Sequence, residues 1–187
     1  MGKLPRESLF LQEKEFYQEQ HVEVLLGRRV QHLSVEARTA LLDDGRELEF
    51  DRVLLATGGR PRRLPLPGAD LPGIHYLRTI DDSDAIQAAI SKSRRVVVVG
   101  GGFIGCEISA ACVQKGLETT IIEVGPCLLD VALDAETAQW ITGYLKERGV
   151  HILTNEKAAR FIEENSRVAG VETTTGKRIP SDFVAVG

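Results

Sequence analysis

The sequence lacks the features that mark disulfide-rich, membrane-spanning and nucleic-acid-binding proteins. It contains only three cysteines, at positions 106, 112 and 127, and no two form a C-x-x-C pair, so no disulfide framework is predicted. No apolar run reaches the roughly 20 residues of a membrane-spanning helix. The net charge is −4 and no basic cluster occurs, which argues against a nucleic-acid partner. We therefore expect a reduced, cytoplasmic protein.

Metal ligands and aromatic side chains are also scarce. The four histidines are scattered and show no metal-ligand spacing, so no metal site is predicted. Aromatic residues make up only 5% of the chain, although hydrophobic residues reach 43%, which is enough to build a core. A length of 187 residues is compatible with one domain or two small ones.

One stretch of the chain carries most of the functional information. Four consecutive valines, residues 96–99, predict a buried strand that leads into the pattern Gly100-x-Gly102-x-x-Gly105. A helix follows, and a second strand ends at Glu123, 18 residues after the last motif glycine. In such a unit the glycines allow a tight turn, a close approach to a pyrophosphate and close helix packing, and the acid accepts hydrogen bonds from a ribose. The stretch predicts a dinucleotide-binding unit.

The same pattern has a plainer interpretation, in which the glycines serve only packing and Glu123 merely ends a strand at the surface. The order of strand, glycines, helix, strand and acid favours the dinucleotide site, because this is the context that confirms the motif. The acid also predicts NADH rather than NADPH, since residues 124–129 contain no lysine or arginine to neutralise a 2′-phosphate.

Turn residues and apolar patterns divide the remaining chain into further elements. Helices are predicted at 9–20, 79–92 and 134–148, strands at 22–26, 30–35, 39–42, 47–50, 53–56, 150–153 and 183–186, and an antiparallel meander at 158–162, 167–172 and 177–179. Prolines and glycines crowd residues 59–73, which excludes a helix or a central strand there and predicts a crossing between domains.

These motifs resemble a known family. Gly-Gly-Gly-Phe-Ile-Gly-Cys-Glu at 100–107, together with Glu123, is similar to the NADH-binding domain of the FAD-dependent pyridine nucleotide-disulfide oxidoreductases, most of all the branch of ferredoxin reductases and apoptosis-inducing factor. Leu-Leu-Ala-Thr-Gly-Gly-Arg-Pro-Arg at 54–62 resembles the part of the FAD domain that precedes the NADH domain, and Tyr76–Asp82 resembles the crossing helix.

The resemblance implies the domain organisation. It predicts an α/β protein with a Rossmann-like NAD-binding domain at 79–187, built from a parallel sheet and a small antiparallel meander, an incomplete FAD-domain segment at 1–60 and a linker at 61–78. Full family members also carry their own glycine motif for FAD, a return to the FAD domain and a dimerisation domain. Since these parts are missing, we expect a fragment that is inactive alone and does not retain FAD.

Site residues follow from the resemblance position by position. It implies that Gly100, Gly102, Phe103, Ile104 and Gly105 line the pyrophosphate, that Glu123 holds the adenosine ribose and that Glu107 faces the nicotinamide carboxamide. It places Val30, Thr57, Gly58 and Arg60 on the FAD side. The family often has an arginine where this chain has Cys127. Cysteine cannot supply that cation, so the resemblance does not determine the adenine contacts at this position.

The implied activity is that of a flavoprotein reductase in the intact protein. Hydride passes from NADH to the flavin, and electrons then pass to an acceptor such as ferredoxin, another redox protein or a small molecule. No side chain of this chain is expected to act as a catalytic acid or base, because the flavin carries the redox chemistry. A non-catalytic NAD(H)-binding module that regulates association with a partner is the alternative. An oligomer is compatible with either.

Overall fold

The computed structural model describes residues 6–187, and these form two compact units, residues 6–59 and residues 60–187. The first five residues of the predicted segment 1–60 lie outside the described residues. Within residues 6–187, none of the helices combines the length and the apolar composition that crossing a membrane requires.

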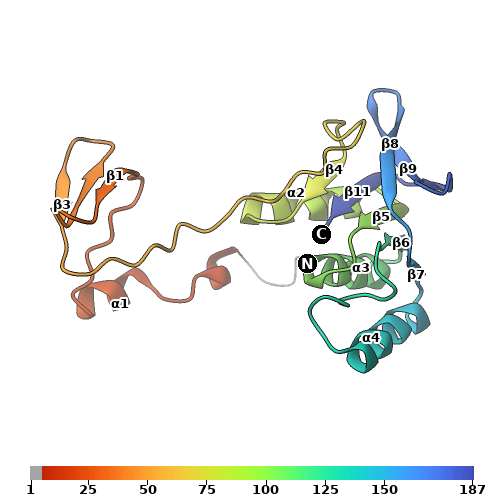
Figure 1. Ribbon diagram of the computed structural model, residues 1–187, viewed down its shortest axis with the longest axis horizontal. Helices are drawn as coiled ribbons and strands as arrows, with labels where there is room; N and C mark the ends of the chain where they lie inside the picture. Colours follow the sequence, from red (N-terminus) through yellow and green to blue (C-terminus); the bar gives the residue numbers. More distant parts are fainter. Residues whose placement is uncertain (1–5) are drawn as a thin grey trace. The chain divides into compact units, whose positions relative to one another are not determined.

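A five-stranded parallel sheet forms the centre of the unit at 60–187 (Figure 1). Its strands in spatial order are β4 (Ile74–Tyr76), β11 (Phe183–Val186), β5 (Arg95–Val99), β6 (Glu118–Ile122) and β7 (Val150–Leu153). The helices are α2 (Ile80–Ile90), α3 (Phe103–Gln114) and α4 (Ala135–Glu147). An antiparallel meander of β8 (Ala158–Glu164), β9 (Arg167–Thr173) and β10 (Arg178–Pro180) completes the unit.

The parallel sheet separates two hydrophobic cores, because successive side chains of a strand point to opposite faces. Val96 and Val98 of β5 pack with the helices, whereas Val97 and Val99 pack with the meander. Figure 1 shows α3 and α4 on one side of the sheet and β8 and β9 on the other. The unbroken valine run of β5 is thus the sequence of a strand that is buried on both faces.

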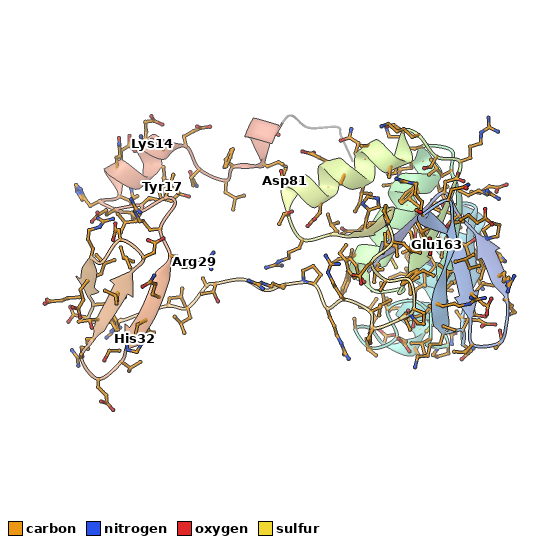
Figure 2. The ribbon with its side chains drawn as sticks, turned by 90° about the horizontal axis from the view of Figure 1, so that it is seen from above. Lys14, Tyr17, Arg29, His32, Asp81 and Glu163 are labelled. Atoms are coloured by element: carbon orange, nitrogen blue, oxygen red, sulfur yellow. The ribbon has the colours of Figure 1, made fainter. Side chains whose placement is uncertain are left out.

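The helices begin where short polar side chains can cap them. Thr79 accepts from the backbone N–H of Asp82, whose carboxylate accepts from the N–H of Thr79, so α2 begins with a capping box. Figure 2 labels Asp81 in the first turn of this helix. Asp134 caps α4 through the N–H of Thr137. In contrast, the N-cap residue of α3 is Gly102, which offers no capping side chain.

The unit at 6–59 is small and mostly exposed. It contains the 3-10 helix η1 (Arg6–Leu9), α1 (Lys14–Glu19) and an antiparallel sheet of β1 (Val30–Ser34), β2 (Thr39–Leu42) and β3 (Glu47–Glu49). Figure 2 labels Lys14 and Tyr17 on α1 and His32 on β1. Among residues 8–59, only Ala40 and Leu42 are buried hydrophobic side chains. This unit therefore has little core of its own.

Several predictions for the N-terminal half differ from the structure. The predicted helix at 9–20 shortens to α1, and neither 22–26 nor 53–56 is a strand. Residues 53–56 carry exposed apolar side chains, with Leu54 at 88% exposure. A strand needs a neighbour that pairs with its N–H and C=O groups, and no strand of residues 6–187 pairs with either segment.

The predicted linker at 61–78 is largely part of the folded unit. It contributes β4 to the parallel sheet, and Leu64, Leu66 and Leu71 pack against the core on the meander side. The hydroxyl of Tyr76 accepts a hydrogen bond from the N–H of Leu64 at 3.0 Å. Prolines exclude a helix there but do not prevent packing. The predicted fold class is confirmed, with its parallel sheet and its meander.

Candidate functional site

The glycine motif forms the turn between β5 and α3. Gly100 has a φ of +106°, a conformation that side-chain-bearing residues rarely adopt. Its N–H donates to the carbonyl of Ile122 at 2.9 Å, which ties the turn to the end of β6. The first glycine therefore allows the tight turn that the motif predicts.

The other two motif glycines have different surroundings. A Cβ on Gly102 would meet no atom of the described protein within 4 Å, so space is open beside this backbone. A Cβ on Gly105 would collide with the backbone carbonyl of Gly100. Gly105 is thus required for packing of α3 against the turn, whereas Gly102 leaves a free approach to the start of the helix.

A fourth glycine, which the motif does not include, belongs to the same turn. The N–H of Gly187 donates to the carbonyl of Val99 at 3.0 Å. A Cβ on Gly187 would collide with the backbone of Gly105. β11 and β5 are parallel neighbours, and a glycine directly follows each of them. The repeated pattern of a buried strand followed by glycine was the sequence signal for this residue.

Glu123 connects the glycine turn to the next loop. It is 8% exposed, and its Oε2 accepts from the N–H of Gly101 at 2.5 Å, while its Oε1 accepts from the N–H of Gly125 at 2.6 Å. A carboxylate oxygen has two acceptor positions, so each oxygen keeps one for a further donor. Glu123 is therefore a buried acid in the turn, which contradicts the plainer interpretation that it only ends a strand at the surface.

A cavity of about 550 Å³ opens at the carboxyl ends of the parallel strands. Gly100, Glu123 and Gly187 line it, and further walls come from Ala158 of the meander and from Arg62, Leu64, Pro65 and Leu66. In open α/β sheets, ligands bind at this edge, where the chain direction of the connections reverses. Of the residues predicted for the dinucleotide, Gly100 and Glu123 line the cavity, whereas Gly102, Phe103, Ile104, Gly105 and Glu107 do not. The cavity, together with the open space beside Gly102, is the candidate dinucleotide site.

Two cations of the cavity wall were missed by sequence reasoning. Arg62 and Lys157 both line the cavity beside Glu123. The expectation of a purely acidic ribose site rested on residues 124–129, which contain no cation. The structure brings cations from two distant segments instead, and no local pattern around Glu123 indicates them.

The remaining predicted residues at the start of α3 are open to solvent. Phe103, Ile104 and Glu107 are exposed in the first turns of the helix. These side chains are accessible to a ligand, and their contacts with the pyrophosphate and the nicotinamide stay predictions.

The residues predicted on the FAD side are not among those that line this cavity. Val30, Thr57 and Gly58 belong to the unit at 6–59, and Arg60 is the first residue of the unit at 60–187. Val30 begins β1 and pairs with Leu42. Their contacts with FAD also stay predictions.

The cysteines near the site are held as thiols. Burial raises the pKa of Cys106 to about 11 and that of Cys112 to about 12. Cys106 donates from its Sγ to the carbonyl of Gly101 at 3.5 Å. A thiol with a pKa of about 11 is only about 0.1% thiolate at pH 8, and the thiolate is the reactive form.

We expect Ellman's reagent at about pH 8 to modify fewer than one thiol per native chain within minutes. In guanidinium chloride, all three thiols should react, which serves as the control. Rapid reaction of Cys106 in the native protein would contradict its burial.

The comparisons with known proteins identify the family. A family model for the pyridine nucleotide-disulphide oxidoreductases matches residues 3–187. The chain belongs to this family.

Several relatives of this chain within the family are ferredoxin reductases. The ferredoxin–NAD(+) reductase component of the biphenyl dioxygenase system of Paraburkholderia xenovorans is 41% identical over 91% of the chain and 42% of its own length. Putidaredoxin reductase of Pseudomonas putida is 31% identical over 100% of the chain and 45% of its own length. The chain thus spans less than half the length of these relatives.

Solved structures agree with this assignment. The ferredoxin reductase for the CYP199A2 system of Rhodopseudomonas palustris superimposes with a TM-score of 0.91 at 33% identity, covering 100% of this chain and 46% of that one. A putidaredoxin reductase–putidaredoxin complex gives 0.89 at 31%, with the same coverage. An FAD-dependent member from Desulfovibrio vulgaris gives 0.70 at 30%, covering 89% and 44%. The predicted branch is confirmed, as are NADH and FAD as cofactors of this family.

Proposed function

We propose that residues 60–187 bind NADH in the cavity at the carboxyl ends of the parallel strands, as the nucleotide-binding part of an FAD-dependent ferredoxin reductase. The observation that carries this proposal is Glu123, a buried carboxylate that lines the cavity and holds the glycine turn through the N–H of Gly101. A glycine turn, a helix start and a ribose acid are thereby assembled in one place.

The protein groups fit the dinucleotide. The open space beside Gly102 admits a pyrophosphate, and the first N–H groups of α3 favour its negative charge. Glu123 retains one acceptor position on each oxygen, which suits two ribose hydroxyls. Leu64 and Leu66 give the cavity wall an apolar surface that suits a flat base.

The role of the protein in the reaction is binding and orientation. When bound, the nicotinamide supplies a hydride to the flavin. The exposed Glu107 on α3 would orient the carboxamide. No described side chain of the cavity is required to move a proton, because hydride transfer between the two cofactors needs no protein acid or base.

The proposed electron acceptor and domain roles of the intact protein are taken from its relatives. Their names contain ferredoxin–NAD(+) reductase and putidaredoxin reductase, so a ferredoxin-type protein is the proposed acceptor of the intact protein. Residues 79–187 are the proposed core of the NADH-binding domain, residues 61–78 its crossing segment, and residues 1–60 the proposed FAD-domain segment. The regulatory-module alternative uses the same nucleotide cavity, and no contact of the described residues favours it.

Titration with both cofactors tests the proposal. We expect NADH to bind with a Kd between micromolar and millimolar values, roughly 8 to 4 kcal/mol of binding free energy. Because Glu123 repels a 2′-phosphate, NADPH should bind at least about tenfold more weakly, and Glu123→Ala should reduce this ratio. The measurement is calorimetry on the 187-residue chain.

Glu118→Ala is a matched control, since Glu118 is an exposed acid at the opposite end of the same strand. It removes the same charge and should leave the ratio unchanged. Circular dichroism must show that Glu123→Ala is folded, because the variant loses two hydrogen bonds to backbone N–H groups. Equal affinities for the two cofactors in the wild type would remove Glu123 from the site.

A further inference from the structure

A second acid lies beside Glu123 in the cavity wall. Glu156 follows β7, and its N–H donates to the carbonyl of Glu123 at 3.0 Å. The N–H of Asn155 donates to the carbonyl of Gly125 at 2.9 Å, so the two loops run together. Both acids line the same cavity. The two strands β6 and β7 therefore each bring a carboxylate to the predicted ribose end of the site.

The carboxylate of Glu156 is held by a short network. It is 5% exposed, and its Oε1 forms an ion pair with the Nζ of Lys177 at 2.5 Å. The hydroxyl of Thr175 donates to the same carboxylate at 2.9 to 3.0 Å. The hydrogen bond from Lys177 lowers the pKa of Glu156 below its usual range, so the acid is ionised at neutral pH.

The charge of the cavity is balanced rather than acidic. Arg62 and Lys157 line it together with Glu123 and Glu156. A 2′-phosphate would meet these cations as well as Glu123, so the size of the preference for NADH also depends on the other charges of the cavity wall. Lys177 is a further cation, but Glu156 holds it in an ion pair. Whether this cation is paired or released changes the net charge at the wall.

We infer that the Glu156–Lys177 pair is a second determinant of cofactor specificity, which excludes a 2′-phosphorylated nucleotide by keeping the Lys177 cation neutralised beside the ribose end of the cavity. This inference rests on the proposed function. Glu156 accordingly affects the 2′-phosphate through the charge of the cavity wall. It does not contact the atoms that react.

The inference predicts that substitutions of the two residues change the cofactor preference in opposite directions. Glu156→Gln keeps the shape of the side chain and a hydrogen bond from Thr175, but it releases the Lys177 cation. The ratio of Kd for NADPH to Kd for NADH should then fall by about fivefold, which is about 1 kcal/mol. Lys177→Met leaves the acid without its counterion, and the same ratio should rise by about threefold.

Matched controls come from a second ion pair of the same meander. Arg178 pairs with Glu172 at 2.7 Å, Glu172 also pairs with Arg160 at 2.8 Å, and none of these residues lines the cavity. Glu172→Gln and Arg178→Met change the net charge of the chain by the same amounts. Both should leave the ratio within about a factor of 1.5, since separated surface charges are screened.

The titrations are made by calorimetry at about pH 8 and about 0.1 M salt, where exposed charges more than about 10 Å apart are screened. The inference is supported if the Kd ratio falls in Glu156→Gln and rises in Lys177→Met while it stays unchanged in both control variants. If NADH binds but the ratio moves in neither variant, or moves equally in the controls, the inference is wrong and the proposed function stands. If the folded wild-type chain binds neither nucleotide at several millimolar, the proposed function fails, and the inference with it.

Discussion

Gly102→Val is expected to abolish NADH binding while the protein keeps its fold. The new side chain would enter the space beside the start of α3, where no protein atom lies within 4 Å of a Cβ. The backbone of Gly102 is extended, with φ −73° and ψ −173°, a conformation that valine adopts without strain. The substitution therefore leaves the packing of the protein unchanged and fills the proposed place of the pyrophosphate.

The expected loss of affinity is at least about 100-fold, or about 2.7 kcal/mol. Calorimetry with NADH measures it, and the circular dichroism spectrum and thermal midpoint should stay close to those of the wild type. Undiminished NADH binding by Gly102→Val would show that the glycine turn is not the phosphate site. The wild-type chain, titrated in parallel, provides the reference.

The dinucleotide unit could be predicted because its signals are local. The valines at 96–99, the three motif glycines and Glu123 occur within one continuous stretch, and each has the surroundings that the motif requires: a strand buried on both faces, a turn with positive φ, and an acid that reaches the turn. Such features depend on neighbouring residues and not on the rest of the fold.

The other half of the cavity could not be predicted in this way. Arg62, Lys157 and Glu156 reach it from the segment before β4 and from the loop between β7 and β8. Their positions at the cavity depend on the register of the parallel strands and on the packing of the meander. Neither of these produces a periodic sequence pattern near Glu123. Gly187 differs from these residues, because a buried strand followed by glycine repeats the pattern of β5, but no local feature indicates that Gly187 packs against Gly105.

The absence of the predicted strand at 53–56 has a related cause. Residues 53–56 are apolar enough for a buried strand, but a strand forms only against a partner, and a sequence pattern does not say whether the partner is present. At 61–78 the prolines showed which structures are excluded. They did not show that Leu64 and Leu66 would cover the sheet.

Gly105→Ala is expected to destabilise the protein by about 3 kcal/mol, although alanine is the better helix former. Gly105 lies in the first turn of α3, where a Cβ would collide with the backbone carbonyl of Gly100. That carbonyl cannot move freely, because the N–H of Gly100 is bonded to Ile122 of β6. Overpacking against fixed backbone therefore outweighs the gain of up to about 1 kcal/mol in helix propensity.

Gly143→Ala provides the opposite case in the same protein. Gly143 lies inside α4, and a Cβ there would meet no atom within 4 Å beyond its own helix. The same chemical change should stabilise the protein by about 0.5 to 1 kcal/mol. Urea unfolding of both variants measures the difference. If both variants shift the free energy of unfolding in the same direction, close packing of α3 on the glycine turn does not determine the effect of Gly105→Ala. The third motif glycine would then have another role.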